Sequence, residues 1–335
     1  MSNDLSPLAY FHQYPLISTN FLSAICYNIS MNNLLIVGSI GFDTIQTPFG
    51  KISRALGGSA THFCLAARYF TRPALVSAAG RDFTARHKKL LTSRGINLDG
   101  LQLGPGKTMA WSARYGYDLN TRKVLFTRLN VLGGFQPKLP KSLTNSQLLF
   151  LSSVSSTQQQ KVLSQLKKPK FVGWDTISYY IEHDRAGLIK NLKAVDCCFI
   201  NDTEARELTR EHNLLKGAKG IMGMMGKNAT LIIKRGEYGL LMFHQDAIFH
   251  LPGFPLEDVV DPTGAGDSFA GGFMGWLAKT DDFSFENLKR ACVYGSVMAS
   301  FCCEKLGTER LQTVTADEIS GRYKKFKELT HFDLV

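Results

Sequence analysis

From residue 148 to residue 234 the sequence repeats one pattern, in which a short apolar run precedes a stretch of helical character. The apolar runs are residues 148–151, 171–175, 197–200 and 230–234, and helical stretches follow the first three of them. Short apolar runs of this kind are typical of strands buried on both faces. Strands that alternate with helices predict a mainly parallel sheet covered by helices, and therefore an α/β fold.

The other segments extend this core and add a smaller unit. Two further strands are expected at residues 34–38 and 74–78, and helices at residues 58–70, 84–94, 265–279 and 285–305. Residues 43–54 are mixed and rich in turn formers, and residues 108–132 alternate imperfectly around a turn at Asp118, as in a β-hairpin. We therefore expect a small β appendage made of about residues 42–55 and 105–133.

The chain has 335 residues, of which 44% are hydrophobic, so it can bury a large core in one main domain. We assign this domain to residues 32–325, with a poorly ordered extension at residues 1–31 and a short tail at residues 326–335. No apolar run reaches the roughly 18 residues of a membrane span, and no secretion signal opens the chain. We expect a cytoplasmic protein without a membrane partner.

The formal net charge of +11 does not by itself predict a nucleic-acid partner. Lys and Arg are scattered, and the densest group, residues 86–89, is short, whereas nucleic-acid-binding proteins concentrate basic residues on one face or arm. The charge instead favours a surface that tolerates anionic ligands such as nucleotides. The seven cysteines contain no C-x-x-C pair, so they fit neither a zinc site nor a disulfide framework.

One segment near the C-terminal end has the features of a catalytic site. Gly264 and Gly266 form a tight turn that opens a helix. Backbone N–H groups at such a turn can bind a phosphate, and the helix dipole adds about half a positive charge there. Asp267 lies in the first helical turn, where its carboxylate can take a proton from a hydroxyl that attacks the phosphate. The alternative is that Asp267 only caps the helix.

The run Asp-Pro-Thr-Gly-Ala-Gly-Asp-Ser-Phe-x-Gly-Gly-Phe, residues 261–273, resembles the C-terminal signature of the ribokinase-like (PfkB) carbohydrate and nucleoside kinases. The resemblance implies a three-layer α/β/α sandwich with a mainly parallel central sheet and a small β lid. It also implies ATP as the phosphoryl donor, with Mg²⁺, and activation of some members by a monovalent cation such as K⁺ near the loop of Asp261. Carried over to this chain, Asp267 is the catalytic base, and the amides of Gly264, Ala265 and Gly266 form the anion hole.

Two upstream matches concern the acceptor substrate. Gly57, Gly58 and His62 belong to a segment that resembles the family's di-glycine hinge, which also faces the sugar, and Asp43 matches the early Asp that binds substrate hydroxyls. Ribokinase-type sequences commonly have Lys at the position of Ser59 and Asn at that of His62, so the departure argues against ribose itself. The alternatives are a flexible Gly-Gly turn and ordinary turn chemistry for Asp43.

Several further residues are expected around the nucleotide. Asn201 and Glu204 resemble the family's Asn-x-x-Glu motif, in which Glu204 would help to hold Mg²⁺, partly through water. A helix N-terminus with an acidic first turn explains the same residues equally well. By the same resemblance, the residues expected to contact the nucleotide are Asn201, Glu204, Lys234, Arg235, Gly236, Gly239, Thr263 and Ser296.

The predicted function is transfer of the γ-phosphoryl group of ATP to a hydroxyl of a sugar or sugar derivative. The first alternative is an adenosine- or inosine-type nucleoside kinase. Aromatic residues of the lid could stack on a base as easily as on a sugar face; they are Phe49, Trp111, Tyr115 and Tyr117. The second alternative is a ligand-binding or regulatory protein on the same fold. The partner is thus a small molecule, and an exposed lid edge could also pair with a second copy to give a homodimer.

Overall fold

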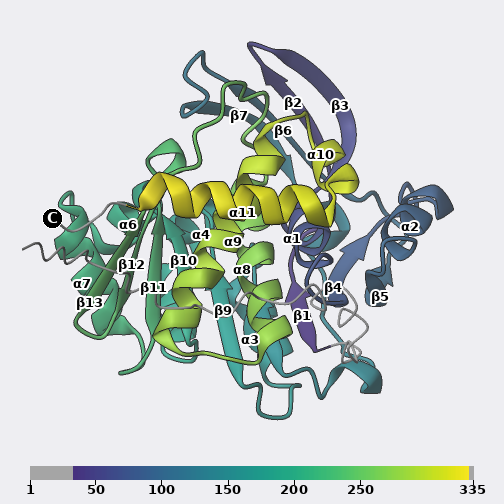
Figure 1. The fold of residues 1–335 in the computed structure, drawn as a ribbon. Helices are drawn as coiled ribbons and strands as arrows, with labels where there is room; N and C mark the ends of the chain where they lie inside the picture. Colours follow the sequence, from purple (N-terminus) through teal and green to yellow (C-terminus); the bar gives the residue numbers. More distant parts are fainter. Residues whose placement is uncertain (1–32, 332–335) are drawn as a thin grey trace, which may run out of the picture.

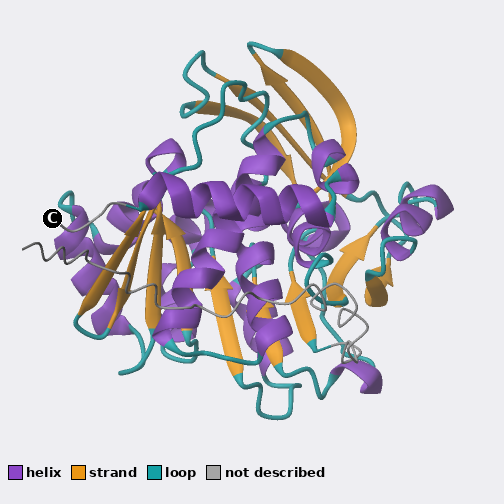
Figure 2. Cartoon of the chain, in the orientation of Figure 1, coloured by secondary structure: helices purple, strands orange, loops and turns teal. Residues whose placement is uncertain are grey.

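The computed structural model describes residues 33–331, so the predicted extension at residues 1–31 lies outside the described part of the chain. Its main feature is a nine-stranded sheet with the order β13-β12-β11-β10-β9-β8-β1-β4-β5 (Figures 1 and 2). In chain order the strands are β1 (Leu34–Val37), β4 (Pro73–Ala79), β5 (Asn97–Leu103), β8 (Leu148–Leu151), β9 (Phe171–Asp175), β10 (Cys197–Asn201), β11 (Thr230–Lys234), β12 (Leu240–His244) and β13 (Ala247–Leu251). The pairs from β5 to β11 are parallel, and only β12 and β13 pair antiparallel. The mainly parallel α/β sheet is therefore confirmed.

Helices cover both faces of this sheet. They are α1 (Ser59–Ala67), α2 (Ala85–Thr92), α3 (Ser156–Leu163), α4 (Ser178–His183), α5 (Arg185–Leu192), α6 (Asp202–Thr209), α7 (Leu214–Met224), α8 (Ala265–Thr280), α9 (Phe285–Cys303), α10 (Glu309–Thr313) and α11 (Ala316–Thr330). Helices α1, α8, α9 and α11 pack on one face, and α3 to α7 pack on the other. The molecule is thus a three-layer α/β/α sandwich, as the sequence predicted.

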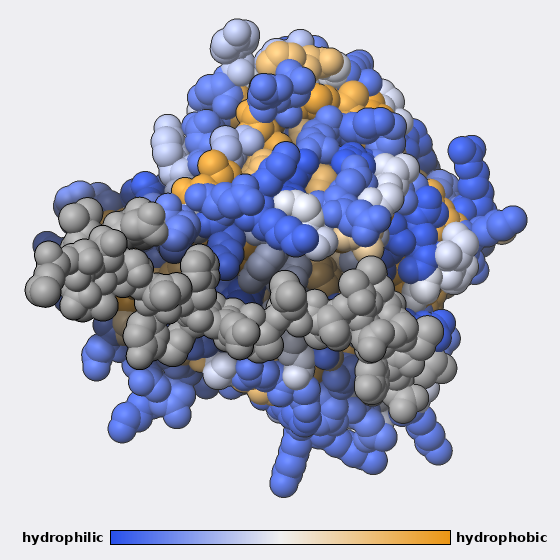
Figure 3. All heavy atoms as spheres, viewed as in Figure 1, coloured by the Kyte–Doolittle hydropathy of each residue, from blue (hydrophilic) through white to orange (hydrophobic). Residues whose placement is uncertain are grey.

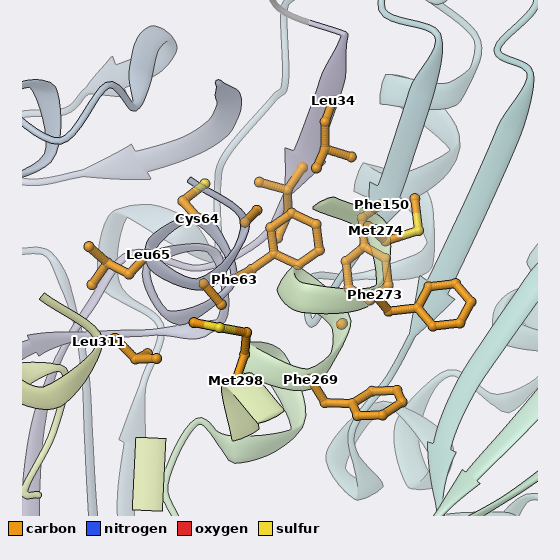
Figure 4. Packing of buried hydrophobic residues seen from close by; sticks show 14 of the residues in the cluster. Leu34, Phe63, Cys64, Leu65, Phe150, Phe269, Phe273, Met274, Met298 and Leu311 are labelled. Atoms are coloured by element: carbon orange, nitrogen blue, oxygen red, sulfur yellow. The ribbon is translucent and has the colours of Figure 1, made fainter. Parts of the chain in front are cut away.

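The sheet is buried on both sides because successive strand residues point to opposite faces. In β1, Leu34 contributes to the core under α1 and α8, whereas Leu35 contributes to the core on the other face. Figure 4 shows Phe63 of α1 packed against Phe150 of β8, with the two rings stacked at 4.8 Å between their centres. Helix α1 is rich in small residues and packs closely against α8. This close packing brings the segment that leads into α1 near the turn that leads into α8.

Four strands form a second, smaller sheet, which lies above the large one in Figure 1. Its order is β3-β2-β6-β7, and its strands are β2 (Gly41–Thr47), β3 (Gly50–Gly57), β6 (Met109–Tyr115) and β7 (Arg122–Arg128). Strands β2 and β6 are parallel, and the outer pairs are antiparallel, so β6 and β7 form the expected hairpin. Apolar residues are visible over this sheet in Figure 3, and Val124 and Leu125 of β7 are among the exposed ones.

Three details differ from the sequence-based expectation. The helical stretch predicted after residues 171–175 is divided into α4 and α5 at Asp184. The Asp184 carboxylate lies over Gly187, where a Cβ atom would be 2.5 Å from a carboxylate oxygen. Strands β5, β12 and β13 were not predicted. Helix α11 continues through the predicted boundary at residue 325, because Phe326 is buried in the core. None of the described helices is both long and apolar enough to span a membrane.

Candidate active site

The turn before α8 has the geometry of an anion-binding site. Gly264 adopts φ 80° and ψ 2° and precedes the first residue of the helix. A Cβ atom on Gly264 would lie 2.1 Å from Cδ2 of His62, so both the left-handed backbone and the close packing require glycine here. The N–H of Ala265 donates to the carbonyl of Pro262 at 3.1 Å, whereas the N–H groups of Gly264 and Gly266 have no described partner. These two amides remain able to bind a phosphate oxygen.

Asp261 fixes this turn to the rest of the domain. Its side chain is fully buried, and its two carboxylate oxygens accept N–H groups from Thr263 at 2.9 Å and from Gly307 at 2.8 Å. Charge-assisted hydrogen bonds to a buried carboxylate are among the stronger ones in proteins. Asp261 therefore holds the segment that leads into the anion-binding turn.

The di-glycine segment allows Asp43 to enter the same region. A Cβ atom on Gly57 would lie 2.0 Å from a carboxylate oxygen of Asp43, and Gly58 adopts φ 88°. The N–H of Gly58 donates to that carboxylate at 3.2 Å. Burial raises the pKa of Asp43 to about 6, although the neighbouring His62 and the Gly58 hydrogen bond act in the opposite direction. The hinge glycines and Asp43 thus form one unit.

His62 connects this unit to the anion-binding turn. Its Nδ1 atom lies 3.1 Å from the carbonyl oxygen of Gly58, and its ring packs against Gly264. Its Nε2 atom is buried and has no hydrogen-bond partner among the described residues. A buried polar atom without a partner is costly, so this nitrogen is a candidate for a hydrogen bond to a bound ligand.

A group of charged side chains lies at the carboxyl ends of β9, β10 and β11. The Nζ atom of Lys234 lies 2.8 Å from a carboxylate oxygen of Asp175, and it would lie 3.2 Å from a Cβ atom on Gly266. Glu204 follows β10 and is buried, and burial together with Asp175 raises its pKa to about 7, against the effect of Lys234. The carboxyl ends of parallel strands are where ligands bind in open α/β sheets.

Asp267 lies in the first turn of α8, between this charged group and the di-glycine unit. Desolvation and then the negative charge of Asp175 raise the pKa of Asp267 to about 7, while Lys234 and Arg122 act in the opposite direction. A general base works best when its pKa is close to the operating pH. Asp267 can therefore take a proton near neutral pH, directly beside the anion-binding turn.

Asn201 and Glu204 form the helix cap that the sequence left as an alternative. The side chain of Asn201 accepts the N–H of Glu204 at 2.8 Å, and a carboxylate oxygen of Glu204 accepts the N–H of Asn201 at 3.1 Å. The cap uses one carboxylate oxygen of Glu204, and the other oxygen is not used by the cap. Within the described chain, no three His, Cys, Asp or Glu side chains are grouped as metal ligands. Mg²⁺ needs only one or two carboxylates besides water and phosphate, so the remaining oxygen of Glu204 fits that ion, with the negative charge of Asp175 nearby.

The other predicted nucleotide residues take different positions. Gly236 and Gly239 have positive φ values of 58° and 79° in the turn after β11, where the N–H of Arg235 donates to the carbonyl of Gly239 at 2.7 Å. These residues follow Lys234 directly and border the same end of the sheet. Ser296 lies midway along α9, half-buried, on the helix that packs beside α8.

Three residues of this region were not predicted in these roles. Asp175 ends a buried strand. A charged residue at the end of an apolar run was the signal in the sequence that could have indicated a functional residue. The hydroxyl of Tyr115 lies 2.9 Å from Oγ1 of Thr263, so the small sheet contacts the anion-binding turn directly. Arg122, at the start of β7, is close enough to influence the pKa values of Asp267, Glu204 and Tyr115.

Known proteins are similar to most of this chain. The pfkB family of carbohydrate kinases matches residues 25–314. The cytidine kinase of Thermococcus kodakarensis is 28% identical over 250 residues, which cover 73% of this chain and 88% of that protein. The nucleoside kinase of Methanocaldococcus jannaschii is 22% identical over 288 residues, which cover 85% of this chain and 90% of that protein.

Solved structures agree on the fold. The crystal structure of the Methanocaldococcus jannaschii nucleoside kinase has a TM-score of 0.70 at 20% identity and covers 88% of this chain and 98% of its own. A putative ribokinase II from E. coli, solved in complex with ATP and Mg²⁺, has a TM-score of 0.73 at 17% identity and covers 88% of this chain and 99% of its own. The chain therefore belongs to the PfkB family of carbohydrate kinases and is a phosphotransferase that acts on a hydroxyl group.

Proposed function

We propose that the protein transfers the γ-phosphoryl group of ATP, in complex with Mg²⁺, to a hydroxyl group of a nucleoside. The observation that carries the reaction type is the position of Asp267 beside the Gly264 to Gly266 turn, with its pKa raised to about 7. Two relatives that span most of the chain, named a cytidine kinase and a nucleoside kinase, support a nucleoside as the acceptor. This choice prefers the first alternative over the sugar predicted initially.

Each residue of the site has a role in this reaction. Asp267 removes the proton of the acceptor hydroxyl as that oxygen attacks the γ-phosphorus. The amides of Gly264 and Gly266 and the ammonium group of Lys234 stabilise the negative charge on the transferred group. Bound Mg²⁺ supplies further charge neutralisation, and Glu204 with Asp175 would hold it, partly through water. Asp43 and His62 orient the acceptor.

A lid residue is placed beside the expected acceptor-binding carboxylate. Trp111 of β6 is paired with Asp43 of β2 in the parallel register, so both side chains point to the same face of the small sheet. Trp111 is half-buried. An indole ring beside a hydroxyl-binding carboxylate offers a surface on which a base can stack while the sugar hydroxyls meet Asp43. The face of a sugar ring can also pack on an indole, so the acceptor assay described below decides between the two classes.

The reaction type is tested with Asp267→Asn. We expect this variant to bind ATP with unchanged affinity and to lose turnover by several orders of magnitude, because only the proton acceptor is removed. Addition of EDTA to the wild-type enzyme should also abolish turnover. Comparable turnover in the variant and the wild type would remove Asp267 from the proposed role.

The acceptor is tested by measuring ATP consumption with cytidine, inosine, adenosine, ribose and fructose. We expect the highest kcat/KM with a nucleoside, and we expect Trp111→Leu to raise the KM for that nucleoside about ten-fold, by loss of stacking worth about 1.4 kcal/mol. Preference for a free sugar, with no effect of Trp111→Leu, would restore the sugar kinase.

Two predicted partners remain proposals. A monovalent cation bound near Asp261 would be attracted by the charge of that carboxylate and would activate the enzyme. If so, turnover should be higher in KCl than in tetramethylammonium chloride. A second copy of the chain would pair on β7, an edge strand whose residues are all exposed, including Val124, Leu125 and Phe126. Light scattering of the wild type and of Phe126→Ser, with a monomer expected for the variant, tests the dimer.

A further inference from the structure

The small sheet is tied to the anion-binding turn by one hydrogen bond between residues 148 positions apart in the chain. The hydroxyl of Tyr115, the last residue of β6, accepts it from Oγ1 of Thr263 at 2.9 Å. Thr263 immediately precedes Gly264, the glycine whose left-handed backbone shapes the turn. A contact from the lid therefore reaches the residue next to the anion-binding amides.

The side chain of Tyr115 is enclosed by the protein. Its side chain is buried, with 7% exposure, whereas Tyr117, two residues further along, is 87% exposed. Burial raises the pKa of the Tyr115 hydroxyl, and Arg122 beside it has the opposite effect. A buried tyrosine normally keeps its hydroxyl paired, so loss of this hydrogen bond leaves a polar group without its partner.

Thr263 is held on its other sides by the large domain. Its N–H donates to the carboxylate of Asp261 at 2.9 Å, and its carbonyl accepts from the thiol of Cys302 at 3.3 Å. Two contacts from the core and one from the lid thus define the position of Thr263. The lid contact is the one that would be lost if the small sheet moved away from the core.

We propose that Tyr115 is a positioning residue for phosphoryl transfer. Its hydrogen bond holds Thr263 in place, so that the amides of the following turn point to the transferred group. This alignment requires the lid to be in contact with the core. The proposal rests on the kinase site described above. An anion hole is effective when its donors are already aligned, and a displacement of about 1 Å can reduce a rate about 100-fold. A single hydrogen bond can therefore couple lid position to the rate of the chemical step.

The test compares Tyr115→Phe with Tyr179→Phe, because both remove one tyrosine hydroxyl and Tyr179 is 46% exposed on α4, apart from the residues assigned to the site. We expect kcat to fall about ten-fold in Tyr115→Phe with the KM for ATP little changed, and no effect in Tyr179→Phe. In a double-mutant cycle, Tyr115→Phe combined with Thr263→Val should be no slower than Thr263→Val alone. The proposal would be overturned if the kcat losses of the two single variants multiplied in the double variant, or if kcat were unaltered in Tyr115→Phe.

A second measurement does not depend on the acceptor. In the full-length protein without ligands, amide hydrogen exchange across residues 259–268 should be about ten-fold faster in Tyr115→Phe than in the wild type, and unchanged in Tyr179→Phe. Equal exchange in all three proteins would show that the hydroxyl does not position the turn, even if no acceptor is found. Faster exchange together with an inactive wild type would instead count against the proposed kinase reaction and leave the positioning role standing.

Discussion

The ammonium group of Lys234 lies 2.8 Å from a carboxylate oxygen of Asp175, although their strands, β11 and β9, are separated by β10. The ion pair therefore crosses over the end of β10, where α6 begins with Asn201 and Glu204. Both partners are largely buried, and the desolvation that lowers the pKa of Lys234 is outweighed by the charges of Asp175 and Glu204, which raise it. The cation is thus fixed in its charged form beside the anion-binding turn.

Replacement of this cation should weaken both catalysis and stability. We expect Lys234→Met to lower kcat about 100-fold, because a positive charge near the transferred phosphoryl group is lost, and to reduce the free energy of unfolding by about 3 kcal/mol, because Asp175 is left buried and unpaired. Steady-state kinetics and urea unfolding measure the two effects. The matched control is Lys170→Met, which removes an exposed ion pair to Asp281 and should cost less than about 1 kcal/mol. Similar losses in both variants would contradict the expectation.

The rate should depend on pH through Asp267. The folded protein holds the pKa of this carboxyl at about 7, and only its ionised form accepts a proton, so kcat/KM should rise with pH and level off above pH 7. Lys234 opposes the raised pKa, so the rise should move to higher pH in Lys234→Met. Rate profiles between pH 5 and pH 9 check both expectations. A flat profile would mean that another group limits the rate.

The same shift predicts a stabilising active-site substitution. An unfolded Asp titrates near pH 3.9, whereas Asp267 in the folded state titrates at about 7, so the folded state binds more protons between these values and loses stability as pH rises. Asp267→Asn removes this loss, and we expect its Tm at pH 8 to exceed that of the wild type by about 2–4 °C. The difference should shrink towards pH 4. Thermal unfolding without ligands measures it, and a lower Tm for the variant at pH 8 would refute the sign.

Two glycine-to-alanine changes should have opposite effects. In Gly264→Ala, the new Cβ atom would lie 2.1 Å from the ring of His62 on a backbone with positive φ, so we expect a loss of about 2 kcal/mol in unfolding free energy, together with loss of turnover. Gly223 lies inside α7 with no atom within 4 Å of the new methyl group, so Gly223→Ala should stabilise the protein by about 0.5–1 kcal/mol at unchanged turnover. Chemical unfolding of both variants provides the comparison.

The strands β1, β4 and β8 to β11 were predicted from the sequence, whereas β5, β12 and β13, which lie at the two ends of the sheet, were not. Strands such as β8 and β11 are buried on both faces and therefore read as continuous apolar runs. Strand β13 is mostly exposed and β5 carries Asn97, Asp99 and Gly100, so neither presents such a run. Edge strands are held by a neighbour on one side and by contacts that no local pattern encodes.

A similar limit applies to the site. Gly264, Gly266 and Asp267 were predicted because they lie together in one run that resembles the signature of a known family. Asp175 was missed because its meaning depends on Lys234, 59 residues away, and the contact of Tyr115 with Thr263 joins two segments 148 residues apart. Residues whose role depends on a distant partner become visible only once the chain has folded.

Glu204 can be retained for two different reasons, one structural and one functional. Its cap to Asn201 helps α6 to begin, and its charge suits it to a metal ion, so a family member that no longer needed the metal would still gain from a Glu at this position. Presence of the acid is therefore weak evidence for metal use in any relative. Its replacement by Gln is the informative case, because the amide keeps the start of the helix and removes only the charge.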